Sequence, residues 1–114
     1  MDLIKDILNS QQQAHSDGFD WPSAHDVINK IKEELEELTV ALNSNDQESV
    51  KDEFGDVLLA LLNLSLHLKL EIKPCLLQSL NKFQTRYKAM LLLAKKSDID
   101  FKDLTLSEKE ALWQ

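Results

Sequence analysis

Two short acidic clusters, at helical spacing, carry the most distinctive chemistry of this sequence. Glu34 and Glu37 lie three residues apart, and Glu53 and Asp56 repeat that spacing. Because residues three apart share one face of an α-helix, two antiparallel helices would bring four carboxylates to one point. Carboxylates this close repel one another unless a cation neutralises them, and hard divalent cations prefer oxygen ligands. The pattern predicts a site for Mg²⁺, with Mn²⁺ as a substitute, and chemistry on phosphates.

Several other side chains are candidates for substrate contacts. Lys82 and Arg86 are four residues apart on one predicted helix face, a spacing that suits successive phosphates as well as two ordinary surface cations. Trp21 and Trp113 offer stacking surfaces for a nucleobase, although packing at the end of a helical bundle would also explain them. For His67 we expect a partly buried structural role.

Length and composition bound the class of protein. The 114 residues predict a single domain, 1–114, and a hydrophobic fraction of 43% is typical of a folded chain. A net charge of −7 argues against a nucleic-acid partner. Cys75 is the only cysteine, so no internal disulfide is expected, and its apolar neighbours predict a buried thiol. With neither a leader nor a membrane-spanning apolar run, we expect no membrane partner and a cytoplasmic location.

The apolar periodicity predicts an all-α protein. Only two Gly and two Pro punctuate the chain, which favours long helices. Pro22 is expected to open the second helix, and Thr105 to Glu108 matches a capping box before the last one. The second helix has a stripe of apolar residues that includes Leu35 and Leu42. We therefore predict a four-helix bundle with a short C-terminal helix. The expected helices span residues 2–14, 23–42, 47–70, 75–95 and 105–113.

The third predicted helix is apolar nearly all round, which predicts burial on all sides. Its leucines are Leu58, Leu59, Leu61, Leu62, Leu64, Leu66 and Leu68. A narrow stripe of mostly polar residues also runs along it, through Glu53, Asp56, Ala60, Asn63 and His67. One small bundle cannot cover so many leucines, so a homodimer or homotetramer is expected. Gly55, next to the stripe, is consistent with a close backbone approach.

The ordered motifs resemble the signature of the MazG-type all-α nucleoside triphosphate pyrophosphohydrolases. Two acidic pairs separated by fifteen residues form its centre, and further segments extend the likeness over about residues 18–113. These segments are Gly18–Trp21, Lys30–Glu34, Asp52–Leu59, Leu62–Leu68, Asn81–Tyr87 and Leu106–Trp113. The resemblance implies hydrolysis of a nucleoside triphosphate to the monophosphate and pyrophosphate.

The resemblance also implies roles for individual residues. The metal ligands would be Glu34, Glu37, Glu53 and Asp56. The predicted substrate-binding residues are Lys30, Asn63, Lys82, Arg86, Trp21 and Trp113. Either Glu33 or Glu37 would accept the proton of the attacking water, and the sequence does not choose between them.

Three alternatives remain open from the sequence. The chain could be a narrower dCTP or dUTP diphosphatase, or a phosphoribosyl-ATP pyrophosphohydrolase of similar helical design. It could also be a non-catalytic helical module that binds nucleotides or dimerises. The sequence does not identify the preferred base or sugar.

Overall fold

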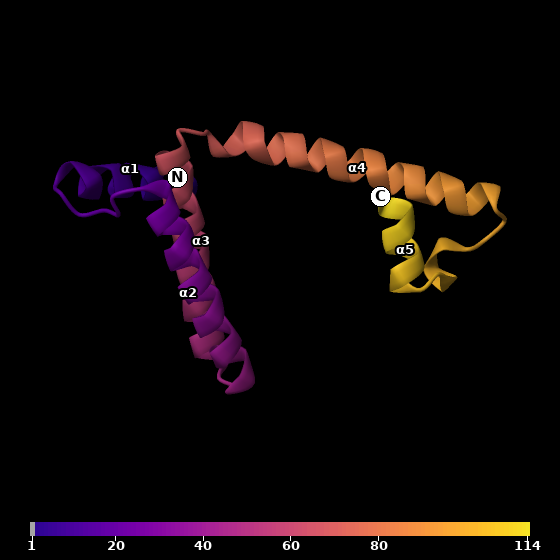
Figure 1. Ribbon diagram of the computed structural model, residues 1–114, viewed down its shortest axis with the longest axis horizontal. Helices are drawn as coiled ribbons and strands as arrows, with labels where there is room; N and C mark the ends of the chain where they lie inside the picture. The colour runs from indigo at the N-terminus through magenta and orange to yellow at the C-terminus, as the bar shows by residue number, and fades with distance from the viewer. Residues whose placement is uncertain (1) are drawn as a thin grey trace. The chain divides into compact units, whose positions relative to one another are not determined.

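The computed structural model describes residues 2–114, which contain helices and their connections and no β-strand (Figure 1). This confirms the all-α prediction. Contacts divide the chain into two compact units, one ending at Ile72 and one formed by residues 73–114. No helix in the described part is long and apolar enough to cross a membrane, and the cytoplasmic location stays a prediction. The helices are α1 Leu3–Ser16, α2 Ala24–Asn43, α3 Gln47–Leu68, α4 Ile72–Lys96, the 3₁₀ turn η1 Phe101–Asp103 and α5 Leu106–Trp113.

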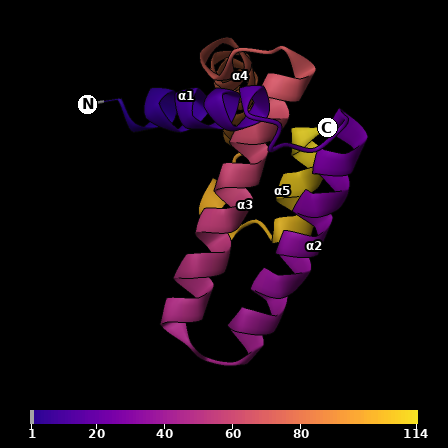
Figure 2. The same cartoon turned by 90° about the vertical axis from the view of Figure 1, so that its left-hand side faces the viewer.

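The centre of the first unit is an antiparallel hairpin of α2 and α3 (Figures 1 and 2). Asn45 turns the chain between them with a positive φ of 59°. Asp46 then caps α3, because its side chain accepts from the backbone N–H groups of Glu48 and Ser49. At the start of α2 the cap is Ser23, so Pro22 precedes the cap and does not open the helix as predicted. The hairpin places the two acidic pairs on neighbouring helices.

Helix α1 lies across the end of the hairpin and contacts α3 (Figure 2). None of the fourteen residues of α1 is buried. One polar contact joins the two helices directly, where the Gln11 Nε2 amide donates to the Leu59 carbonyl oxygen at 2.9 Å. The connector from Asp17 to Ser23 then leads from α1 into α2.

The core of the hairpin is narrow. Val27, Ala41 and Val57 are its buried apolar residues, and the carboxylate of Glu34 is buried among them. Val27, Glu34 and Ala41 are each seven residues apart, so they form one seam along α2. Leu35 and Leu42 belong to the predicted apolar stripe, yet both are exposed, because only α3 packs on α2 within this unit.

Within the first unit helix α3 is covered only in part, as expected for one copy of a helix with so many leucines. Leu58 and Leu61 are 46% and 45% exposed, and Leu59 and Leu68 are similarly open, because only α1 and α2 pack on α3 within the unit. Apart from its chain neighbours and the backbone of its own helix, a Cβ atom added at Gly55 would meet no atom of the described residues within 4 Å. The expected close backbone approach at Gly55 is therefore absent from this structure.

The second unit is built on α4 and the C-terminal segment. Met90 and Ala94 are its buried apolar residues. Aromatic rings join α4 to α5, with the ring centroids of Phe83 and Trp113 5.4 Å apart. The predicted capping box at the start of α5 is confirmed.

The C-terminal half also differs from the sequence-based expectations. The predicted burial of Cys75 is wrong: its thiol is exposed, because α4 buries no residue before Met90. Neither unit contains four long helices by itself, so the four-helix bundle stays a prediction.

Candidate active site

Carboxylates from α2 and α3 converge on the hairpin. Oxygen atoms of Glu34, Glu37 and Glu53 all lie within 4.8 Å of one another. A second group with the same closeness joins Glu53 to Asp52 and Asp56. Glu53 belongs to both groups, so the four residues predicted as metal ligands form one continuous cluster. Asp52 is an addition that the predicted ligand set lacks.

The interior of this cluster is short of hydrogen bonds. Glu34 is only 7% exposed. The Oε2 atoms of Glu34 and Glu53 are enclosed, and neither has a hydrogen-bond partner among residues 2–114. An enclosed carboxylate oxygen without a partner is costly, and a bound cation is a common remedy. The residues present therefore fit a hard divalent cation with oxygen ligands.

The electrostatics of the cluster lead to the same conclusion. Burial raises the pKa of Glu53, and it is raised further by the hydrogen bond that a protonated Glu53 would donate to Glu37 and by the negative charge of Glu37. Burial also raises the pKa of Asp56, with added repulsion from Asp52 and Glu34 that Lys30 partly offsets. Both shifts mean that the cluster disfavours its fully ionised form until positive charge is supplied.

Lys30 supplies one positive charge from within α2. Its Nζ lies 3.1 Å from Oε1 of Glu34, one helical turn away, and 3.8 Å from Oε2 of Glu33. The hydrogen bond to Glu34 and the charges around it raise the pKa of the Lys30 ammonium. Lys30 is thus at the carboxylate cluster and is paired with one of the expected ligands, while its role in binding substrate stays a prediction.

Both candidates for the general base border one pocket. Glu33 is an exposed residue whose side chain is 67% accessible, whereas Glu37 lies inside the carboxylate cluster. A pocket of about 520 Å³ is lined by both residues and by Glu53. The pocket leaves room for a substrate phosphate and a water beside the carboxylates.

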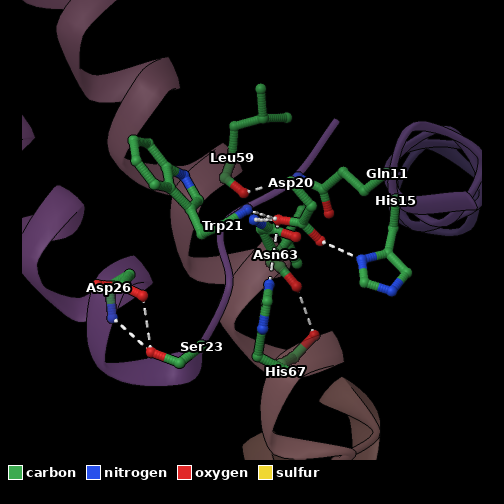
Figure 3. A network of polar contacts seen from close by, with 11 residues as sticks. Gln11, His15, Asp20, Trp21, Ser23, Asp26, Leu59, Asn63 and His67 are labelled. Atoms are coloured by element: carbon green, nitrogen blue, oxygen red, sulfur yellow. Dashed lines mark hydrogen bonds and ion pairs between the residues drawn. The ribbon is translucent and has the colours of Figure 1, made fainter. Parts of the chain in front are cut away.

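A second polar network lies where α1, the connector and α3 meet (Figure 3). Its centre is Asp20, which accepts from the Trp21 backbone N–H at 2.6 Å and from the Asn63 Nδ2 amide at 3.1 Å. Ring nitrogens of His15 and His67 each lie 3.1 Å from an Asp20 oxygen. Burial by itself would raise the pKa of Asp20, but the hydrogen bonds from Asn63, His67 and Trp21 outweigh it and lower the pKa. Asp20 is therefore a fixed anion that holds three chain segments together.

This network borders a pocket of about 270 Å³. Trp21 and Asn63, both predicted to bind substrate, line it together with Phe19, Asp20 and Gln11. Gln11, His15 and Asp20 were not among the residues predicted from the sequence. Gln11 and Asp20 have partners on α3 that lie more than forty residues away along the chain, so no local pattern marks them. The partner of His15 is Asp20 itself, five residues away. The contact of His67 with Asp20 is consistent with the structural role expected for that histidine.

The remaining predicted substrate-binding residues lie in the second unit. Lys82 and Arg86 are exposed on α4, one helical turn apart. The Arg86 guanidinium lies 5.2 Å from the centroid of the Trp113 ring, in cation–π geometry. The structure thus brings Arg86 and Trp113 together.

Comparison with protein families identifies the lineage of the chain. The model of the MazG nucleotide pyrophosphohydrolase domain matches residues 22–91. The chain belongs to the MazG family. The matched range includes both acidic pairs, Lys30, Asn63, Lys82 and Arg86, whereas Trp21 and Trp113 lie outside it.

Individual bacterial proteins are also similar to this chain. A protein of Thermotoga maritima named nucleoside triphosphate pyrophosphohydrolase/pyrophosphatase MazG is 34% identical over 91% of this chain. The nucleoside triphosphate pyrophosphohydrolase of Escherichia coli K12 is 27% identical over the same share. The chain spans only 40% of the length of each of these relatives. The uncharacterized protein YabN of Bacillus subtilis is 32% identical over 59% of the chain, which spans 14% of that relative.

Proposed function

We propose that this chain hydrolyses nucleoside triphosphates to nucleoside monophosphates and pyrophosphate with the help of Mg²⁺. The observation that carries the proposal is the carboxylate cluster on the α2–α3 hairpin, with its two enclosed and unpartnered oxygens. The MazG family match and the names of the Thermotoga and Escherichia relatives support the same reaction.

The proposed ligands of the cation are Glu34, Glu37, Glu53 and Asp56, and Mn²⁺ is expected to substitute. When bound, such a cation neutralises phosphate oxygens and makes a water more acidic. Asp52 is near enough to Glu53 and Asp56 to contribute a further oxygen. In this proposal the carboxylates would hold the triphosphate, through the cation, beside the pocket that Glu33 and Glu37 line.

The attacking water must lose a proton, and the carboxylate that accepts it must be ionised at the working pH. Glu33 and Glu37 both border the 520 Å³ pocket, and both remain candidates. Glu33 forms an ion pair with Lys30, whereas the negative charge of Glu37 acts on its neighbour Glu53. The general base would take a proton from the attacking water as the bond between phosphorus and pyrophosphate breaks.

Cations are the other groups proposed to bind the substrate. Lys30 stands at the carboxylates and would contact the triphosphate directly. Lys82 and Arg86 offer two charges on one face of α4, and Trp113 stacks against Arg86. The three cations would stabilise the negative charge that develops on the leaving pyrophosphate, and Trp113 would contact the nucleotide.

Product analysis tests the proposal. Incubation of the chain with a panel of nucleoside triphosphates and Mg²⁺ should release pyrophosphate and monophosphate in equal amounts. Release of inorganic phosphate and a diphosphate would identify a different reaction. Tight nucleotide binding without any product, with Mn²⁺ as well as Mg²⁺, would favour the non-catalytic alternative. The panel should include phosphoribosyl-ATP, dCTP and dUTP, because turnover of only one of these would identify one of the narrower enzymes.

We also propose that the active form is a homo-oligomer, a dimer or a tetramer. Support comes from the exposed apolar side chains of α3 and from the small number of buried apolar residues in each unit. We retain the cytoplasm as the proposed location and a nucleotide, not nucleic acid or a membrane, as the proposed partner.

A further inference from the structure

Two side-chain amides line the 270 Å³ pocket between α1, the connector and α3, and their orientation is fixed by their partners. The Nε2 group of Gln11 donates to the Leu59 carbonyl, and the Nδ2 group of Asn63 donates to an Asp20 oxygen. A carbonyl accepts only, and Asp20 is an acceptor while it is ionised, as its lowered pKa favours. The NH₂ end of each amide must therefore face its partner, and the carbonyl end must face the other way.

The two carbonyl ends are left without partners. Gln11 Oε1 and Asn63 Oδ1 are enclosed, and neither has a hydrogen-bond partner within residues 2–114. Both residues line the same pocket. An enclosed acceptor that receives no hydrogen is unfavourable, so the pocket favours a ligand that brings N–H or O–H donors.

Two aromatic side chains of the connector complete the pocket. Phe19 is 82% exposed and Trp21 is 44% exposed, although both are large apolar groups. Flat aromatic faces beside fixed polar acceptors are suited to a planar heterocycle, which stacks on the rings and presents its edge to the acceptors.

The position of the pocket relative to the carboxylates fits one nucleotide. Asn63 follows Asp56 by seven residues on α3, which places both on one face about 10 Å apart along the axis. Glu53, which lines the 520 Å³ pocket, is ten residues from Asn63, or about 15 Å along the axis. Separations of about 10 to 15 Å are comparable to the distances from the phosphates to the base of an extended nucleoside triphosphate. A triphosphate at the carboxylates would therefore bring its base toward Asn63.

We infer that this pocket selects nucleobases that carry an exocyclic amino group, with Gln11 Oε1 and Asn63 Oδ1 accepting its hydrogens. The inference rests on the proposed pyrophosphohydrolase function and names the substrates that it would favour. A keto group in place of the amino group presents lone pairs to both acceptors, so uracil and hypoxanthine are disfavoured relative to cytosine and adenine. Asp20 acts as a positioning residue, since it holds the Asn63 amide in the orientation that leaves the carbonyl free.

Matched nucleotide pairs give the first test. We expect kcat/KM to be about 10- to 100-fold higher for dCTP than for dUTP, and for ATP than for ITP. A preference in only one pair would support the inference and assign the ring size that the pocket accepts. Equal kcat/KM values in both pairs, with pyrophosphate as the product, would overturn the inference and leave the proposed function intact.

A substitution at Gln11 tests whether the preference for dCTP over dUTP depends on the side-chain carbonyl oxygen of Gln11. Gln11→Met keeps a similar side-chain length and removes the acceptor, so the ratio of kcat/KM for dCTP over dUTP should fall at least about threefold. Gln12→Met is the matched control, because Gln12 does not line this pocket. An unchanged ratio in Gln11→Met would count against Gln11 as an acceptor. Asn63→Leu tests the second acceptor in the same way, with circular dichroism to verify its helix content.

A binding measurement separates failure of this inference from failure of the proposed function. Calorimetry with the α,β-imido analogues of dCTP and dUTP reports the preference without turnover. If no nucleotide releases pyrophosphate, the proposed function fails, yet tighter binding of the dCTP analogue would still support amino-group selection. Equal dissociation constants for the two analogues would refute it.

Discussion

At the scale of single residues, the carboxylate cluster is the proposed cation site and, without a cation, a source of instability. Glu53 lies in both groups of converging carboxylates, and its Oε2 atom is enclosed without a partner. We expect Glu53→Gln to reduce turnover by about 100-fold or more, because a neutral amide binds Mg²⁺ far less well. Pyrophosphate release at saturating Mg²⁺ measures this. The control is Glu71→Gln, an exposed glutamate between helices, and wild-type activity in Glu53→Gln would refute the four-ligand site.

The same substitution should stabilise the metal-free protein in a pH-dependent way. The folded-state pKa of Glu53 is raised above its ordinary value of 4.5, so just above pH 4.5 the folded chain binds more protons than the unfolded chain. Its contribution to stability is therefore full below that pH and is lost as pH rises through the raised pKa. Asp20 acts oppositely, but only below its ordinary value of 3.8, outside this window.

Thermal unfolding in the presence of a chelator checks the sign. The Tm of Glu53→Gln should exceed that of the wild type near pH 7, and the difference should shrink toward pH 5. A difference that is constant with pH would show that the ionisation of Glu53 does not destabilise the fold.

Arg86 offers a second test at the residue scale. If its guanidinium holds a phosphate, Arg86→Ala should cost about 2–4 kcal/mol in transition-state binding, measured from kcat/KM. Arg86→Lys should restore activity only in part, since an ammonium cannot form two parallel hydrogen bonds. Lys88→Ala, which removes an exposed cation two residues along α4, is the control. Unchanged kinetics in Arg86→Ala would leave Arg86 as a surface cation that stacks on Trp113.

At the scale of elements, the apolar periodicity predicted where the helices lie. It did not predict which of their faces are covered by other helices. The spacing of Glu53, Asp56, Asn63 and His67 follows from helical geometry alone, so the sequence placed them correctly on one face. It could not show that Asp20 meets that face, because contacts between residues far apart in the chain leave no local periodicity. The exposed positions of Leu35 and Cys75 were missed for a related reason, since an apolar residue appears the same in sequence whether or not a partner covers it.

Replacing the two glycines by alanine should have opposite effects on stability, because Gly55 lies within a helix and Gly18 lies in a turn. Gly55 lies within α3 with open space around it, so Gly55→Ala should raise the stability of the isolated chain by about 1 kcal/mol. Gly18 also has open space, but its φ is +87°, so Gly18→Ala should be destabilising. Chemical denaturation measures both. Loss of stability in Gly55→Ala would indicate that a second chain approaches this face, in line with the close approach predicted from the sequence.

At the scale of the whole molecule, more apolar side chains of the described residues are exposed than buried. Apolar side chains remain exposed on α3 and α4, while the most deeply buried apolar residue of the described chain is a valine, Val27, at 1% exposure. If a second copy covers α3, the interface should be apolar and on the order of 2,000 Å² or more.

Leu61→Glu tests this directly, because Leu61 is exposed on α3 and does not contribute to the buried core. Sedimentation equilibrium at micromolar concentration should show an oligomer for the wild type and a lighter species for Leu61→Glu. Lys51→Glu, another substitution at an exposed position of the same helix, should leave the mass unchanged. A folded and active wild-type monomer would refute the proposed assembly.

The absence of buried residues in α1 has a dynamic consequence. A helix held by Gln11 on Leu59 and by His15 on Asp20, with no core residue of its own, should open far more often than the hairpin beneath it. Ligand in the adjoining pocket contacts Gln11, so occupancy should suppress that opening. Amide hydrogen exchange should therefore be fast in α1 of the free protein and slow selectively when nucleotide is added. Equal protection of α1 with and without nucleotide would mean that the pocket and this helix are energetically independent.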